Sequence, residues 1–66
     1  MNKKQKEYIA QNIYFRAENG VLKVGYYKEG NWQTLKVEPY ESYEELGRKA
    51  LSYTLEDLFN LWRQSR

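Results

Sequence analysis

Residues 13–37 read IYFRAENGVLKVGYYKEGNWQTLKV and predict a three-stranded antiparallel meander. The pair Asn19-Gly20 suits a two-residue type I′ turn, because both central residues of that turn need a positive φ. Counting outward from this turn pairs Phe15 with Val24 and Ile13 with Tyr26. The alternation of side chains along a strand then gathers the apolar residues on one face.

A second turn is expected within residues 28–31, as a four-residue loop or as a Gly30-Asn31 loop. Either loop places Leu35 and Val37 on the apolar face. Pro39 ends the third strand, because proline cannot donate a hydrogen bond to a sheet. The predicted apolar face consists of Ile13, Phe15, Leu22, Val24, Tyr26, Leu35 and Val37.

Residues 42–65 predict a helical region that contains two helix starts. Ser42 and Glu45 form one capping box, in which Glu45 reaches back to Ser42, and Thr54 and Asp57 repeat the pattern. On a continuous helix the apolar residues would form two opposite stripes. The first stripe is Leu51, Leu55, Leu58, Phe59 and Trp62, and the second is Tyr43, Leu46, Ala50, Tyr53 and Leu61.

A three-stranded sheet can cover only one of these stripes. A break or bend near Ser52-Tyr53 is therefore favoured, because these residues are weak helix formers beside a cap. The alternative is one long helix that offers its second stripe to another chain.

The N-terminal residues are the least determined. Residues 1–6 are polar and basic and are expected to be a frayed tail. Residues 7–12 fit either a short helix or an extension of the first strand, and the position of Ile9 slightly favours the strand.

The composition bounds the function. The 66 residues make a single domain with a net charge of +2, and they include no cysteine and no histidine. Thiolate zinc sites, disulfides and histidine-based catalysis are excluded, and no phosphate-binding loop is present. We expect a protein that is not an enzyme, with no cofactor, no metal and no catalytic residues. With no membrane segment or signal peptide, a cytoplasmic location is expected.

Two binding functions fit what remains. The first is a regulatory module that acts through protein–protein contact, in which the partner is another protein or, in a homodimer, a second copy of the chain. Such a module is compatible with a regulator or inhibitor from a phage or mobile element. Its contacts would use the helical surplus Leu46, Tyr53, Leu61 and Trp62. The second is nucleic-acid binding by the opposite sheet face, through Tyr14, Arg16, Lys23, Tyr27, Trp32 and Lys36.

If residues 7–12 are helical, the order helix, three strands, helix is similar to that of double-stranded-RNA-binding domains. The stretch Gly47-Arg48-Lys49-Ala50 is similar to the basic residues near the start of the last helix in that family. In this chain, however, Arg48 and Lys49 lie a turn inside the helix, and the second cap has no counterpart. The resemblance therefore concerns the fold alone, and no residue roles follow from it.

The sequence as a whole predicts a two-layer α+β domain. The tail (1–6) precedes a β-meander (7–37), which packs on one kinked or two short helices (42–65).

Overall fold

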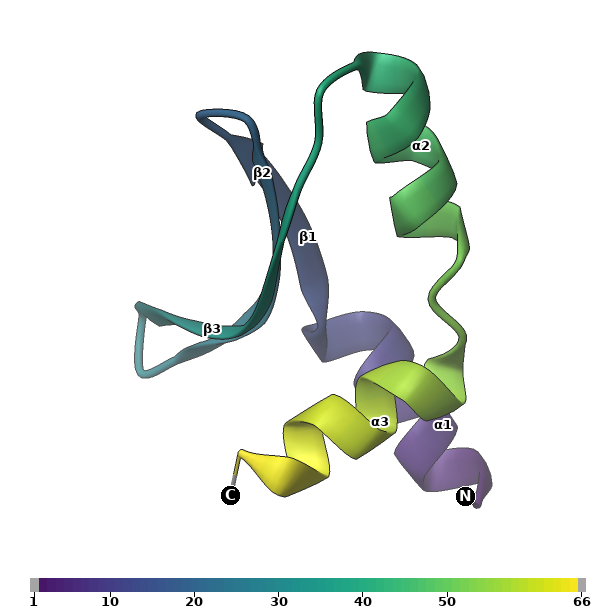
Figure 1. Ribbon diagram of the computed structural model, residues 1–66. Coiled ribbons are helices and arrows are strands. Elements are labelled where there is room, and N and C mark those ends of the chain that lie inside the picture. Colours follow the sequence, from purple (N-terminus) through teal and green to yellow (C-terminus); the bar gives the residue numbers. More distant parts are fainter. Residues whose placement is uncertain (1, 66) are drawn as a thin grey trace.

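The computed structural model describes residues 2–65 and shows an α+β domain with one three-stranded sheet (Figure 1). The elements in chain order are α1 (Lys3–Asn12), β1 (Tyr14–Glu18), β2 (Val21–Lys28), β3 (Asn31–Pro39), α2 (Tyr43–Leu51) and α3 (Leu55–Gln64). The strands follow one another in the order β1-β2-β3 and are antiparallel, which confirms the predicted meander.

Both turns of the meander are two-residue loops with positive φ at each position. In the first, φ is +52° at Asn19 and +78° at Gly20. The pairing of β1 with β2 follows from this turn as predicted, from Glu18 with Val21 to Tyr14 with Gly25.

The second turn uses Glu29-Gly30, at φ +53° and +82°, and Lys28 pairs with Asn31. It therefore differs from both loops that the sequence suggested. Glu29 has to adopt the left-handed conformation, which is uncommon for a residue with a Cβ, and this is why the sequence did not indicate it.

A β-bulge in β3 changes which side chains face the helices. Gly25 pairs with Thr34 but Val24 pairs with Lys36, so Leu35 is the extra residue. Beyond the bulge the register is shifted by one residue, which exchanges the two faces of the strand. The prediction for Val37 is therefore wrong, because it pairs with Lys23 and points away from the helices.

The N-terminal segment is helical, so the slight preference for a strand at residues 7–12 is wrong. Lys3 to Lys6, expected to be frayed, form the first turns of α1, while Met1 lies outside the described residues. Asn2 caps the helix by accepting a hydrogen bond from the amide of Gln5, whose side chain accepts from the amide of Asn2. Asn2 and Gln5 have the spacing of a capping box, so this start of α1 is a local signal of the sequence.

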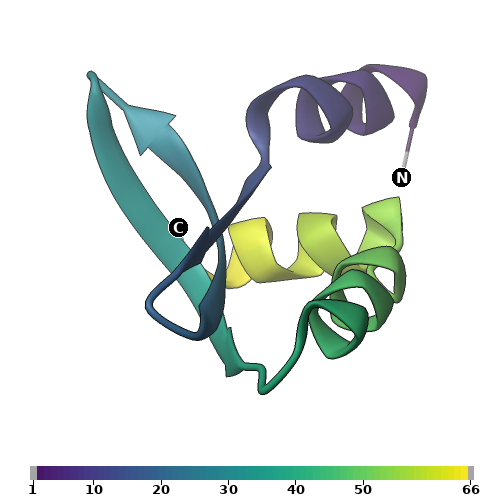
Figure 2. The same cartoon turned by 90° about the horizontal axis from the view of Figure 1, so that it is seen from above.

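All three helices lie on one side of the sheet (Figure 2). The core between the two layers is small, and its buried residues are Ile9, Ile13, Leu22, Val24 and Leu58. Partly buried residues complete it: Tyr26, Leu35, Tyr53, Phe59, Leu61 and Trp62. Ile9 comes from α1 and is 1% exposed, so the first helix supplies a core residue that the sequence assigned to a strand.

The C-terminal region consists of two helices separated near Ser52-Tyr53, as favoured from the sequence. Thr54 and Asp57 form the expected capping box, whereas Glu45 turns away from Ser42 and pairs with Lys49 instead. Because the helix breaks, the two predicted stripes are redistributed. Leu51, placed in the core stripe by the sequence, is 88% exposed.

Gly25 is required by close packing and Gly47 is not, which gives a matched pair of variants. A Cβ on Gly25 would clash with the carbonyl oxygen of Gln33 and would lie 2.7 Å from Cζ2 of Trp32. We expect Gly25→Ala to lower the free energy of unfolding by about 2 kcal/mol or more. Gly47→Ala, which meets only open space on a helix, should raise it by about 0.5–1 kcal/mol. Urea unfolding measures both, and equal effects of the two variants would contradict this packing.

Candidate functional site

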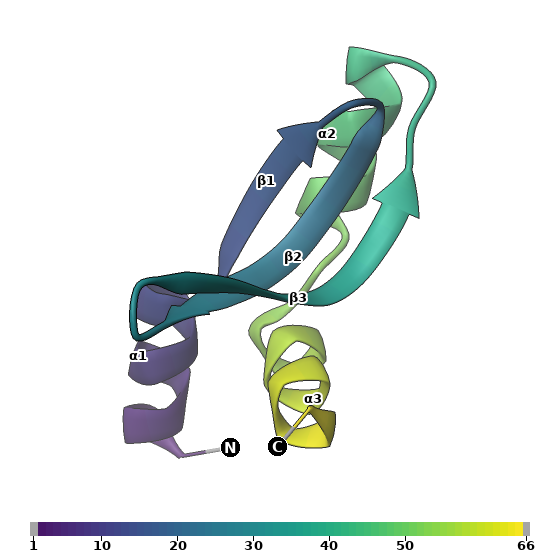
Figure 3. The ribbon, with the colours of Figure 1, turned by 90° about the vertical axis from the view of Figure 1, so that its left-hand side faces the viewer.

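The sheet face that points away from the helices, hereafter the outer face, is not covered by any element of the described chain (Figure 3). The strand pairing places on it Tyr14, Arg16, Glu18, Val21, Lys23, Gly25, Tyr27, Trp32, Thr34, Val37 and Pro39. Three of its large side chains are about half exposed, namely Tyr14 at 47%, Tyr27 at 54% and Val37 at 49%.

An aromatic row crosses the outer face. The ring of Trp32 lies over Gly25, where any side chain would displace it. The ring centroids of Trp32 and Tyr27 are 5.2 Å apart, and those of Tyr27 and Tyr14 are 5.8 Å apart, both in edge-on arrangements. The indole Nε1 of Trp32 donates to Oγ1 of Thr34 at 2.7 Å, which fixes the orientation of the ring. The row is therefore ordered before any ligand arrives.

Two cations sit directly opposite each other beside this row. Arg16 on β1 pairs with Lys23 on β2, and like charges in such a position are destabilising. The guanidinium of Arg16 lies 5.0 Å from the ring centre of Trp32 and forms an ion pair with Glu18 at 2.9 Å. No such neutralising contact is seen for Lys23 within the described chain. The sheet thus holds an unneutralised ammonium next to exposed rings.

Of the six residues predicted to contact nucleic acid, the structure brings five together on the outer face. These are Tyr14, Arg16, Lys23, Tyr27 and Trp32. Lys36 is separated from them by the bulge, because it pairs with Val24 and lines a polar groove with Tyr53 and Asp57 on the helix side. The sequence also missed Val37 as a member of the outer face, since only the bulge places it there.

The four residues predicted as helix contacts do not form one surface. Tyr53, Leu61 and Trp62 pack against the core cluster, while Leu46 lies on α2 and is partly buried. Trp62 also lines an open groove of about 540 Å³ between α1 and α3, and its ring centroid is 5.3 Å from that of Tyr8. Three of the four residues predicted as partner contacts therefore pack within the domain.

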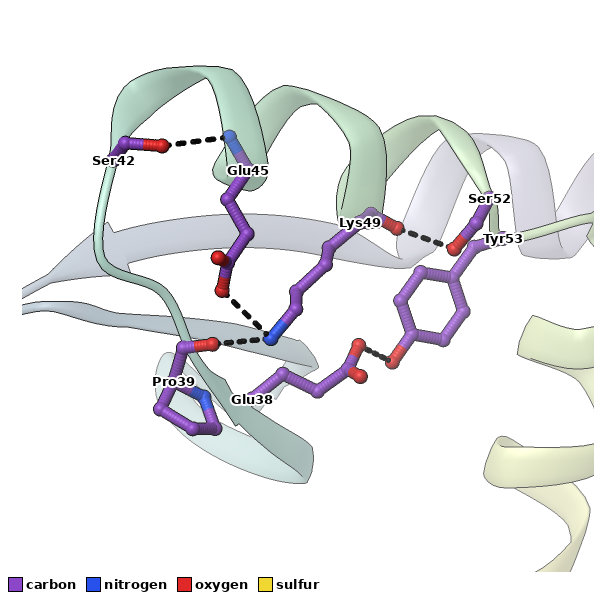
Figure 4. A network of polar contacts seen from close by, with 7 residues as sticks. All are labelled: Glu38, Pro39, Ser42, Glu45, Lys49, Ser52 and Tyr53. Carbon is purple, nitrogen blue, oxygen red and sulfur yellow. Dashed lines mark hydrogen bonds and ion pairs between the residues drawn. The ribbon is translucent and has the colours of Figure 1, made fainter.

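Polar contacts connect α2 to β3 (Figure 4). The Nζ of Lys49 donates to the carbonyl oxygen of Pro39 and lies 3.2 Å from Oε1 of Glu45. Just beyond the helix, the hydroxyl of Tyr53 donates to the carboxylate of Glu38. Burial raises the pKa of the Tyr53 phenol above its ordinary value of 10.0, and the hydrogen bond to Glu38 raises the pKa further. The phenol is therefore a stable donor, and these polar contacts join α2 and the segment just beyond it to β3.

The described residues include no candidate metal-binding cluster. Within residues 2–65, no three carboxylate side chains lie close enough together to hold a metal ion. No helix in this part of the chain is long and apolar enough to span a membrane. The outer face is the stronger candidate for a functional site, because its aromatic rings are held in place, two of them are about half exposed, and two cations lie beside them.

Comparison with known proteins adds no relative: no protein-family model, curated protein or solved structure matches this chain. The fold and the outer face define the class, a small α+β domain with an open, aromatic and cationic sheet face.

The Tyr53–Glu38 hydrogen bond predicts a pH-dependent difference between the wild type and Tyr53→Phe. At about pH 8, losing this bond to a carboxylate should lower the free energy of unfolding by about 1.5 kcal/mol. Because the folded pKa lies above the 10.0 of the unfolded phenol, this contribution is complete below pH 10 and is lost as the pH rises towards the folded pKa. Urea unfolding at about pH 8 and about pH 11 should therefore show the difference shrinking.

Tyr26→Phe is the control for this experiment, since the Tyr26 side chain also packs against the core but its hydroxyl has no hydrogen-bond partner in the described chain. A Tyr53→Phe difference that grows with pH would contradict the assigned role of the hydroxyl.

Proposed function

We propose that this protein is a small non-enzymatic binding module that acts through contact with another protein, and that the outer face is its contact surface. The observation that carries the proposal is the ordered row of Tyr14, Tyr27 and the partly exposed Trp32, on a face that no helix within residues 2–65 covers. Aromatic residues and arginine are the residue types that most often dominate the energy of protein interfaces.

The order of the aromatic row supports this role energetically. Side chains that are immobile before binding lose little conformational entropy on association. Contacts between Trp32, Thr34 and Arg16 hold the largest ring of the row in place. Val37 extends the apolar part of the surface beyond the rings.

The charges on the outer face indicate the chemistry of the partner. Arg16 and Lys23 carry two positive charges, and the ion pair with Glu18 offsets only one of them. A carboxylate on the partner would relieve the repulsion between these two cations. The surface therefore fits a protein that presents apolar side chains around an acidic group, and a regulator or inhibitor that covers such a surface is one role consistent with it.

Nucleic-acid binding is the second candidate, and the same cross-strand cation pair favours it. Rings beside cations can stack on bases while the cations contact phosphates. Two observations make it the weaker candidate. Arg16 already occupies a face of Trp32 and pairs with Glu18, and Lys36 does not belong to the outer face.

A capture experiment with matched variants tests the proposal. Immobilised protein is exposed to nuclease-treated lysate of its source cells, and captured proteins are identified by mass spectrometry. The partner should then be titrated against Tyr27→Ala and Lys23→Gln, each of which should weaken its affinity by about tenfold. Gln11→Ala, an exposed change on α1, is the control and should bind as the wild type does.

The outcome that would contradict the proposal is a partner whose affinity is unchanged in Tyr27→Ala and Lys23→Gln although both variants are folded. Fluorescence anisotropy with labelled single- and double-stranded DNA and RNA decides the alternative. If the affinity for one of these nucleic acids falls steeply with salt and is lost in Lys23→Gln, nucleic-acid binding is the function of the outer face and the protein-contact proposal is wrong.

A further inference from the structure

The helix α2 leaves two of its large apolar residues in solvent, while two of its charged residues face the sheet. Glu45 and Lys49, which form the ion pair beside Pro39, point towards the sheet (Figure 4). Tyr43 and Leu51 are 85% and 88% exposed, and α2 contributes no buried residue. A helix usually turns its apolar stripe to the core and its charges to water.

The exposed apolar residues lie on one line of the helix. Tyr43, Gly47 and Leu51 are spaced four residues apart and span an arc of about 80° on a helix with 3.6 residues per turn. Gly47 lies between the two large side chains, and a Cβ built on it would meet nothing within 4 Å. Tyr43, Gly47 and Leu51, hereafter the α2 stripe, thus form a shallow surface with a low centre that another helix can approach closely.

We propose that the α2 stripe is a self-association surface, on which the α2 of a second copy of this chain packs in antiparallel orientation. A twofold axis through Gly47 brings Tyr43 of each copy against Leu51 of the other. Both large exposed side chains are then covered by the same contact, as an isologous interface requires.

The charges beside the stripe favour this partner. Glu44 and Arg48 lie on the same flank of α2, both exposed and without an ion pair to another described residue. In the antiparallel arrangement the twofold axis places Glu44 of one copy about 3 Å along the helix axis from Arg48 of the other. Two such cross-pairs form, and the opposite flank of the stripe carries Leu46 and Ala50, which are uncharged.

The size of the surface sets the strength of the association. A nine-residue helix is only about 13 Å long, so the contact belongs to the small interfaces that support weak and reversible complexes. A dissociation constant on the order of 100 µM is expected for such a contact. Because α2 and the outer face lie on opposite sides of the sheet (Figure 2), the dimer leaves both outer faces accessible.

Sedimentation equilibrium between about 10 µM and about 1 mM protein tests the proposal directly. The average mass should rise from the 8.0 kDa of the monomer towards twice that value. Tyr43→Gln and Leu51→Gln should each weaken the dimer by about tenfold or more. Since both side chains are exposed in the monomer, urea unfolding at low concentration should show that these variants remain folded.

Variants that exchange the charges of Glu44 and Arg48 distinguish the antiparallel dimer from other modes of association. Glu44→Arg and Arg48→Glu should each weaken the dimer, and the double variant should restore it, because it rebuilds both cross-pairs with reversed signs. Glu56→Arg is the matched control, since Glu56 occupies the first turn of α3 and is exposed, and it should leave the dimer unchanged.

Two results would overturn the proposal. One is a mass that stays at that of the monomer up to about 1 mM. The other is a dimer that survives Leu51→Gln or that the double charge exchange does not restore. Concentration-dependent amide shifts in residues 43–51 should accompany association, and shifts confined to the outer face would assign the dimer to the sheet instead.

Discussion

The β-bulge at Leu35 is the constraint on which the arrangement of this domain depends. It directs two consecutive residues of β3, Leu35 and Lys36, to the helix side, and it releases Val37 to the outer face. Past the bulge, Glu38 also lies on the helix side, opposite Leu22. One extra residue in the third strand therefore gives the inner face one end, hereafter the polar end, at which β3 contributes Lys36 and Glu38 beside the apolar Leu22 of β2.

The two ends of the inner face hold their helices by different physical means. At the opposite end, α1 and α3 bury Ile9 and Leu58 against Val24. At the polar end, Glu38 accepts from Tyr53 and the backbone of Pro39 accepts from Lys49, so the α2 region is attached by hydrogen bonds. Tyr43 and Leu51 are 85% and 88% exposed, because they lie on the side of α2 away from Glu45 and Lys49, which face the sheet.

A chain of 66 residues can build only a small core, and its large apolar residues exceed what that core can hold. The excess is sorted to opposite sides of the sheet. Tyr14, Tyr27 and Trp32 gather on the outer face around a pair of cations, and Tyr43 and Leu51 lie on α2. If both proposals hold, each dimer would present two outer faces, and a multivalent partner would bind with a higher effective affinity than a single face provides.

Local signals in the sequence determined the elements of the fold. The Asn19-Gly20 turn set the pairing of β1 with β2, and the cap at Thr54 set the start of α3. The same kind of signal, Asn2 followed by Gln5, was available for α1. Such signals can be recognised in the sequence because the residues that form each turn or cap lie within about four positions of one another.

Most of the candidate outer face was predictable, since Tyr14, Arg16, Lys23 and Tyr27 follow from the first turn and the alternation of the strands. Trp32 follows from the alternation along the third strand. The sequence did not predict that Val37, and not Lys36, lies on the outer face. A bulge depends on how β2 and β3 pack together and not on the residues of one strand.

Only the tertiary structure decided which apolar side chains of the C-terminal region are buried. The periodicity of the helices offered two stripes, and the sequence placed Leu51 inside and Tyr53 outside. The structure reverses both, because the polar end of the sheet accepts the Tyr53 hydroxyl and leaves Leu51 in water. Helical periodicity shows which residues share a side, but the surface on which the helix packs determines which side is buried.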